Sequence, residues 1–201
     1  MIRRIVLSRT YRQSSVHRTE LTEIDPENRL LHRQNRFRVE AEIVRDLYLS
    51  ASGLLEPRVG GPSVFPPLPP DIASLSYANN FKWGRSDWND RPDRPGGIAP
   101  SDDIYRRGMY TFFKRTAAHP TLTTFDCPDA NTTCVDRATS NTPLQALATL
   151  NNQVFVDAAR AFAERLLSES HENDAARIGR AFRLCVARPP SSGESEALLR
   201  L

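Results

Sequence analysis

The stretch that decides the fold runs from Arg106 to Phe155: RRGMYTFFKRTAAHPTLTTFDCPDANTTCVDRATSNTPLQALATLNNQVF. Its first part, residues 108–115, is rich in aromatic residues, which favour β-strands. We expect this strand to pair with residues 121–125 in a small β-hairpin that turns at Ala118-His119-Pro120.

A helix is expected to begin near the end of this stretch. Thr142 and Gln145 have the spacing of a capping box, and Pro143 stands at the first helical position. In such a cap the threonine side chain accepts a hydrogen bond from the backbone of the third helical residue. The sequence therefore predicts a helix start at Thr142.

The sequence indicates further helices before and after this stretch. Residues 36–52 carry apolar side chains at helical spacing, and Gly53 suits a helix C-terminus. Asp25-Pro26-Glu27 predicts a short helix that continues through Leu31. Later helices are expected over residues 155–168, over residues 175–186, and after a capping box of Ser191 and Glu194.

An irregular excursion is expected over residues 53–104, which hold most of the prolines and glycines of the chain. The fold class predicted is mainly α, a helical bundle-like domain with the small hairpin and this long Pro/Gly-rich excursion. We expect a single domain over residues 1–201, truncated at both ends because each end falls inside a helical pattern.

Composition excludes several classes of protein. The 39% hydrophobic and 25% charged content is ordinary for a globular domain, and no apolar run reaches the ~20 residues of a membrane span. The N-terminus lacks the apolar region of a secretory signal. A net charge of +3 without a basic stripe gives no indication of nucleic-acid binding.

The polar loop before Thr142 holds the candidate catalytic residues. Asp126 and Asp129 are a carboxylate pair of the kind that hydrolyses glycosides, and Arg107 and Arg137 are candidates for binding an anion or a ligand. The structural alternative is that both aspartates bond turn backbone and that Arg137 pairs with one of them.

Three more polar residues are weaker candidates. His119 is a candidate acid or base, although an exposed histidine in a turn is the simpler interpretation. Arg12 and Gln13 follow an apolar segment, so they either line a pocket or cap a helix end. No metal site is predicted, because structural zinc needs four cysteine or histidine ligands and only His119 lies near Cys127 and Cys134.

Several segments together resemble a known family, the planctomycete cytochrome-associated domain of unknown function, often called the PSD-one domain or domain of unknown function fifteen fifty-three. The segments are TYRQSS (10–15), DPENRLLHRQNRFRVEAEIVRD (25–46), GGPSVFPP (60–67), RRGMYTFFKRT (106–116), FDCPDANTTCVDR (125–137) and SNTPLQALATLNNQVFVDAA (140–159). The resemblance covers almost the whole chain and implies the C-terminal part of a large exported protein that carries haem c elsewhere.

This resemblance implies an extracytoplasmic location and neighbouring domains of the same protein as partners. No Cys-x-x-Cys-His occurs, so no cofactor is expected in this chain. In an exported protein, Cys127 and Cys134 could form a disulfide; the alternative is two reduced or partly buried thiols.

Two functions are compatible with these features. The first is a module that binds or scaffolds, either recognising a polysaccharide or docking on the haem-bearing neighbour. The second is a hydrolase or other enzyme of complex polysaccharides. An enzyme requires Asp126, Asp129, Arg107 and Arg137 to converge on an open pocket, whereas a scaffold would use them in pairs beneath the loop.

Overall fold

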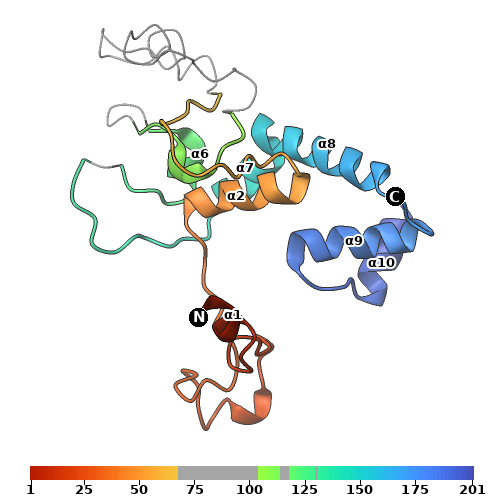
Figure 1. Ribbon diagram of the computed structural model, residues 1–201. Helices are drawn as coiled ribbons and strands as arrows, with labels where there is room; N and C mark the ends of the chain where they lie inside the picture. The colour runs from red at the N-terminus through yellow and green to blue at the C-terminus, as the bar shows by residue number, and fades with distance from the viewer. Residues whose placement is uncertain (68–103, 114–117, 130) are drawn as a thin grey trace, which may run out of the picture. The chain divides into compact units, whose positions relative to one another are not determined.

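The computed structural model describes residues 1–67, 104–113, 118–129 and 131–201, which divide into two compact units, residues 1–39 and residues 40–201 (Figure 1). Most of the expected excursion over 53–104 lies outside the described residues. The described part is mainly helical, as predicted. That the whole chain forms one domain stays a prediction.

The first unit holds a short helix, α1 (Ile2–Val6), and a 3-10 helix, η1 (Thr19–Leu21). The helix predicted after Asp25 is wrong. The Asp25 carboxylate instead accepts the N–H groups of Arg29 and Leu30, at 2.7 and 2.9 Å. Asn28 adopts a φ of 55° and bonds the backbone of Arg33, so this segment is a hydrogen-bonded loop.

The second unit is built on helix α2 (Ala41–Ser52), which begins five residues later than the predicted Arg36. Gly53 ends it with a φ of 82°, as predicted. Arg165 donates from Nη1 to the carbonyls of Ser50 and Ala51, at 3.2 and 2.9 Å. An arginine from another helix therefore donates to carbonyl groups in the last turn of α2, where the Ser50 carbonyl also accepts the Gly53 N–H at 3.2 Å.

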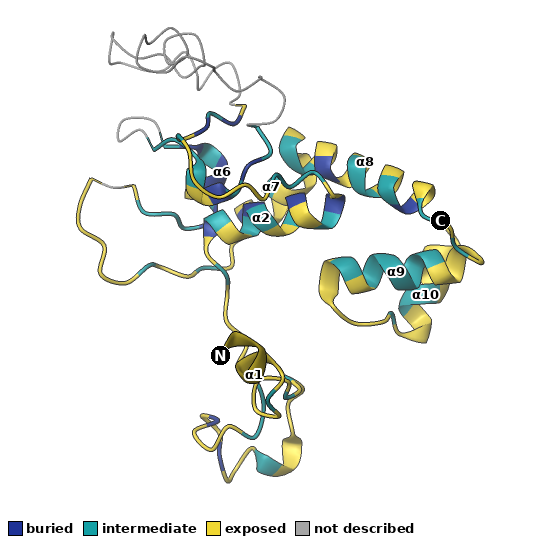
Figure 2. Cartoon of the chain, viewed as in Figure 1, coloured by how far each residue is buried: buried dark blue, intermediate teal, exposed yellow. Residues whose placement is uncertain are grey.

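The core of the second unit lies between α2 and the short helix α6 (Pro120–Thr124). Ala41, Leu122 and Phe125 are buried there, and Phe155 packs against them. The Phe155 ring lies 4.6 Å from the ring of Tyr48 and 6.1 Å from that of Phe125. Figure 2 shows the buried positions on the facing sides of α2 and α6.

The predicted hairpin is wrong. Residues 120–124 form α6, because Pro120 suits the first turn of a helix and Leu122 and Phe125 then point into one core. Residues 108–110 form a 3-10 turn, η2 (Gly108–Tyr110). Extended pairing is limited, in the described residues, to isolated parallel bridges of Glu56 with Arg106 and of Val64 with Thr111.

Gly108 allows a close approach of two backbones. A Cβ at this position would lie 2.4 Å from the carbonyl oxygen of Glu42 and 2.7 Å from its Cα. Both atoms belong to the backbone of α2 and cannot rotate away. Only glycine therefore fits here, and the segment 106–111 lies directly against α2.

The second half is helical as expected: α7 (Pro143–Asn151), α8 (Gln153–Ser168), α9 (Asp174–Val186) and α10 (Ser192–Leu199). The capping boxes of Thr142 with Gln145 and of Ser191 with Glu194 are both confirmed. None of the helices in the described residues combines the length and the apolarity needed to cross a membrane.

Candidate functional site

The segment 126–140 joins α6 to α7, and we call it the 126–140 loop. It leaves the core directly after buried Phe125, where Asp126 turns the chain with a φ of 66°. Such a φ is uncommon for a residue other than glycine, although aspartate is among those that tolerate it. The backbone N–H of Cys127 then bonds the carbonyl of Leu122 at 3.0 Å, which fixes the start of the loop to α6.

Asp126 closes the loop at its base. Its carboxylate accepts the backbone N–H of Ser140 at 2.8 Å and the Ser140 hydroxyl at 2.8 and 2.9 Å. Gln145, which is buried in the first turn of α7, donates from Nε2 to the same carboxylate at 3.2 Å. Both carboxylate oxygens are therefore occupied by donors from the far end of the loop.

Arg137 ties the loop to α2. Its Nη1 lies 2.8 Å from Glu42 Oε2 and 3.4 Å from Glu40 Oε2. Burial alone would raise the pKa of the Glu42 carboxyl, but its hydrogen bonds, the one from Arg137 foremost, together with the charge of Arg137 hold that pKa below its usual range. Arg137 therefore pairs with glutamates of α2 and its N-cap, not with an aspartate of the loop.

Asp129 bonds within its own turn. Its carboxylate accepts the backbone N–H and the side-chain amide of Asn131, both at 3.0 Å. These bonds, with the side-chain one foremost, lower the pKa of this exposed carboxyl. Asp129 therefore carries a negative charge at neutral pH.

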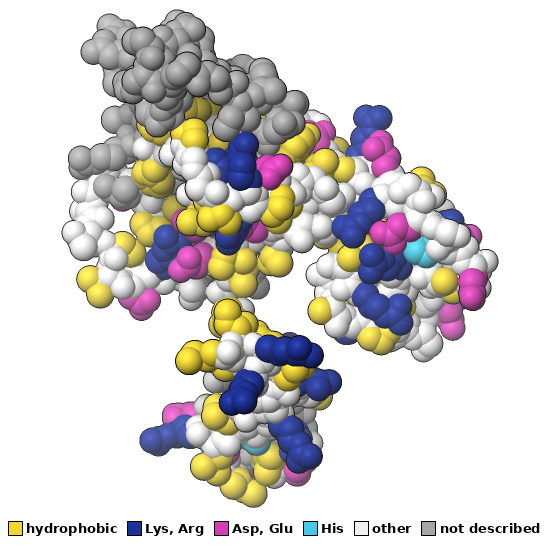
Figure 3. All heavy atoms as spheres, viewed as in Figure 1, with side chains coloured by type: hydrophobic (Ala, Val, Ile, Leu, Met, Phe, Trp, Pro, Cys, Tyr) yellow, Lys and Arg dark blue, Asp and Glu magenta, His cyan; other side chains and the backbone are white. Residues whose placement is uncertain are grey.

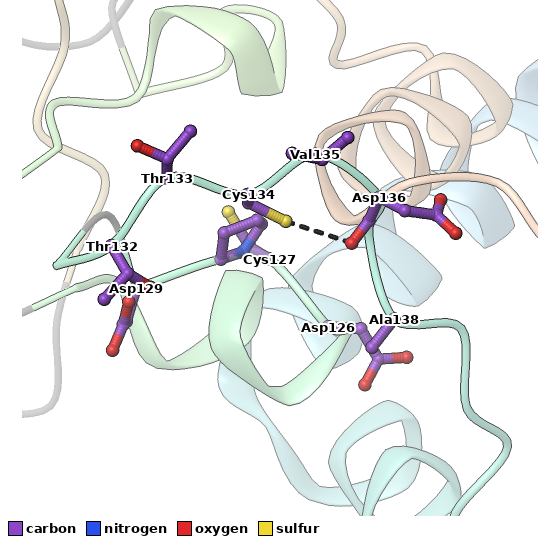
Figure 4. Close-up of a pocket in the computed structure, with 10 residues that line it drawn as sticks. Asp126, Cys127, Asp129, Thr132, Thr133, Cys134, Val135, Asp136 and Ala138 are labelled. Atoms are coloured by element: carbon purple, nitrogen blue, oxygen red, sulfur yellow. Dashed lines mark hydrogen bonds between the residues drawn. The ribbon is translucent and has the colours of Figure 1, made fainter.

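The loop lines an open hollow of about 470 Å³ (Figure 4). Its wall combines carboxylates, hydroxyls and thiols, from Asp126, Asp129, Asp136, Thr132, Thr133, Cys127 and Cys134. Val135 stands at the loop surface and is 98% exposed. The hollow can offer hydrogen bonds to a polar ligand, and Val135 can offer an apolar contact.

Arg107 and Arg106 lie outside this hollow. Arg107 Nε pairs with Asp46 Oδ2 of α2 at 2.9 Å, and Asp46 Oδ1 accepts the Gly108 N–H at 2.6 Å. Arg106 is fully buried, donates to the carbonyls of Arg58, Gly60 and Pro62, and lies 3.8 Å from the centre of the Tyr110 ring. Both arginines hold neighbouring segments in place.

His119 is buried, so the expectation of an exposed turn histidine is wrong. It stands at the N-cap of α6, where the predicted turn is the start of a helix. Burial, followed by the positive charge of Arg45, lowers the pKa of its imidazole to about 4. The ring is therefore neutral at neutral pH and lies away from the 126–140 loop hollow.

Arg12 and Gln13 belong to the first unit. Gln13 lines a hollow of about 470 Å³ with Arg9, Thr10, Leu30 and Leu31. Arg12 is exposed, and its backbone N–H bonds the carbonyl of Ser8 at 3.1 Å. The proposed binding roles of both residues stay predictions.

All three cysteines carry free thiols. The Cys127 thiol donates to Glu42 Oε1 at 3.8 Å, and the exposed Cys134 thiol donates to the Asp136 carbonyl at 3.1 Å. Burial, followed by the charge of Glu42, raises the pKa of Cys127 to about 11. The disulfide stays a prediction.

Across the described ranges, no three His, Cys, Asp or Glu side chains come close enough to hold a metal ion.

The structure thus brings Asp126 and Asp129 to one hollow. Arg137 instead pairs with Glu42 and so ties the loop to α2, and Arg107 pairs with Asp46. The acidic partners Glu42 and Asp46 were missed by sequence reasoning. A signal existed, because two like charges four residues apart on a helix repel each other unless bases pair with them. On the face drawn in Figure 3, basic and acidic side chains of the second unit are interspersed, consistent with such pairing.

No curated protein and no solved structure matches this chain. One family does: PSD1, described as "Protein of unknown function (DUF1553)", matches residues 1–201. Since the match spans the whole chain, the protein belongs to the PSD1 (DUF1553) family of proteins of unknown function.

Proposed function

We propose that this chain is a binding or scaffolding module that presents the 126–140 loop to a ligand. The observation that carries the proposal is that charged residues of the loop bond to other residues of the chain. Asp126 bonds Ser140 and Gln145, and Arg137 bonds Glu42, so these charges hold the loop to its helices. A loop that is fixed at its base and exposed at its tip is suited to recognition.

The charge states also favour binding over hydrolysis. A glycoside hydrolase needs one carboxyl group that keeps its proton near neutral pH, and burial is what usually provides it. Asp129 is exposed and has a lowered pKa, and the oxygens of Asp126 already accept hydrogen bonds. Both features support a module that binds a polysaccharide without cleaving it.

The family resemblance of the sequence supports a location and a neighbouring domain for this module. It supports an extracytoplasmic module of a larger protein with a haem c domain as its neighbour. In that setting the loop faces either a complex polysaccharide or the neighbouring domain. The polysaccharide is the better ligand for a hollow lined by hydroxyls and carboxylates, because such groups pair with sugar hydroxyls.

The test is a glycan array with the full-length protein and two matched variants. Val135→Ser changes an exposed apolar side chain of the 126–140 loop, which we call its tip. Val59→Ser makes the same change at a residue that is 81% exposed and lies outside the loop. We expect wild type and Val59→Ser to bind the same glycans and Val135→Ser to bind them more weakly. Equal binding by all three proteins would contradict recognition by the loop tip.

A further inference from the structure

Cys127 and Cys134 lie seven positions apart in sequence, yet both line the hollow of the 126–140 loop. Figure 4 shows both sulfur atoms at this hollow. Cys127 is fixed, because its N–H bonds Leu122 and its side chain packs against the core of Ala41, Leu122 and Phe125. Cys134 stands on the exposed part of the loop, and its thiol bonds only the carbonyl of Asp136 among the described residues.

The surroundings of the two thiols differ. Cys127 is half-buried beside α2, where its thiol donates to Glu42 Oε1. The charged groups that face it are Glu42 and Glu40 on the acidic side and Arg137 on the basic side. The acidic groups oppose ionisation of the thiol more than Arg137 favours it, and burial opposes it most. Cys127 is therefore a protonated, protected thiol at neutral pH, whereas Cys134 is open to reagents in solution.

We propose that Cys127 and Cys134 form a thiol–disulfide pair in which exposed Cys134 reacts first with an external disulfide and Cys127 then closes the bond. The external oxidant is a disulfide compound, of which oxidised glutathione is the simplest. This assigns an order and a role to each thiol.

The chemistry balances as two exchanges. The Cys134 thiolate attacks one sulfur of oxidised glutathione, forms a mixed disulfide and releases one glutathione thiolate. Cys127 then loses its proton to water, attacks Cys134 Sγ and releases the second glutathione thiolate. Two protein thiols are oxidised, one glutathione disulfide is reduced to two thiols, and the released thiolates take up the protons.

Closure has a structural consequence. The Cys127 thiol no longer donates to Glu42, so that carboxylate is left to Arg137. The new bond joins the exposed half of the loop to the core at Cys127 and restricts the residues between them, including Asp129, Thr132 and Thr133. The value of this rigidity for ligand binding rests on the proposed function, but the exchange chemistry does not.

The test uses the full-length protein in a buffer of oxidised glutathione, with acid quenching, alkylation and peptide mass spectrometry over time. We expect a glutathione adduct at Cys134 to appear first and then give way to a linked Cys127–Cys134 peptide. Cys185 is an internal control, because it is an exposed thiol on α9, away from this hollow, and its adduct should persist. Closure should quicken about tenfold per pH unit between roughly pH 7 and 9, as the Cys127 thiolate fraction rises.

Two variants separate the steps. Cys127→Ser should accumulate a lasting adduct at Cys134, and Cys134→Ser should leave Cys127 unmodified for at least about ten times longer than Cys134 in wild type. The proposal is overturned if the Cys134 adduct in wild type persists as it does in Cys127→Ser, or if Cys127 is modified first. The wild-type time course decides this even if a variant fails to fold. Because no glycan is present, the result is independent of the proposed function.

Discussion

Ser140 donates both its backbone N–H and its hydroxyl to the carboxylate of Asp126, 14 residues earlier in the chain. This pair closes the 126–140 loop directly in front of α7. The Asp126 carboxylate, a candidate for catalysis from sequence, thus fastens the base of the loop. Its removal should therefore lower the free energy of unfolding.

Asp126→Asn is expected to destabilise the protein by about 1–3 kcal/mol, the cost of weakening hydrogen bonds to a charged acceptor. Asparagine keeps the size of the side chain and tolerates the positive φ, so the change removes the charge and replaces one acceptor oxygen by an N–H donor. Urea unfolding followed by circular dichroism measures the loss. The control is Asp136→Asn, the same change at an exposed position of the same loop, which should alter stability by less than about 0.5 kcal/mol.

Gly108→Ala should be among the most harmful small substitutions. The added Cβ would meet the backbone of Glu42 at 2.4 Å, and neither segment can give way without moving α2. We expect a loss of about 3 kcal/mol or more, at the upper end of overpacking costs. Gly193→Ala is the matched control: nothing lies within 4 Å of its Cβ, and alanine favours the helix that contains it. Equal midpoints for the two variants would contradict the close approach.

Thr142→Ala removes the side-chain acceptor that caps α7 and should cost ~1 kcal/mol. Its hydroxyl accepts the Gln145 N–H at 3.3 Å, while the Gln145 side chain accepts the Thr142 N–H at 3.2 Å. Thr149→Ala, on the exposed side of the same helix, is the control and should not lower the unfolding midpoint. A Thr142→Ala variant as stable as wild type would show that the cap contributes nothing.

Glu194 should titrate far below an ordinary glutamate. Hydrogen bonds from Arg188, and then from the Ser191 backbone, lower its pKa to about 2. The unfolded value is higher, so its contribution to stability is present above about pH 4.5 and is lost as the pH falls toward 2. An NMR titration of the Glu194 side chain measures this directly. Arg188→Gln should move the midpoint upward toward the ordinary value.

The features that sequence predicted correctly are local ones. The capping boxes at Thr142 and Ser191 and the cap at Gly53 each depend on a few neighbouring residues, and all are present. The helices predicted over residues 155–168 and 175–186 depend only on apolar side chains at helical spacing. Such features can be predicted because they depend on neighbouring residues and not on distant segments.

The errors arose where distant segments compete. The aromatic run after Gly108 resembles a strand, but it pairs with Val64: the Val64 N–H bonds the Tyr110 carbonyl at 2.7 Å, and Phe112 stacks on Phe65. That partner lies more than forty residues away in the sequence, so no local pattern points to it. His119-Pro120 fits a turn and a helix start equally well from sequence, and burial of Leu122 and Phe125 decides for the helix.

The candidate site was found in part. The loop, its two aspartates and its two cysteines were singled out from residue types alone. The residues that hold the loop to α2 were not identified, because Glu42 and Arg137 are 95 residues apart and no local pattern links them. Of the structural interpretation, only the part on Asp129 matches the structure, because Asp129 bonds the backbone of its own turn. Asp126 instead bonds Ser140, 14 residues later, and Arg137 pairs with Glu42.

The central claim is that the charges of the 126–140 loop support a binding surface and do not cleave a ligand. The most direct measurement is the release of new reducing ends from a bound polysaccharide by the full-length protein, alongside Asp129→Asn. Asp129 is exposed, so this variant should fold normally. We predict binding with no release by either protein. Release by wild type that Asp129→Asn abolishes at an unchanged unfolding midpoint would contradict the account.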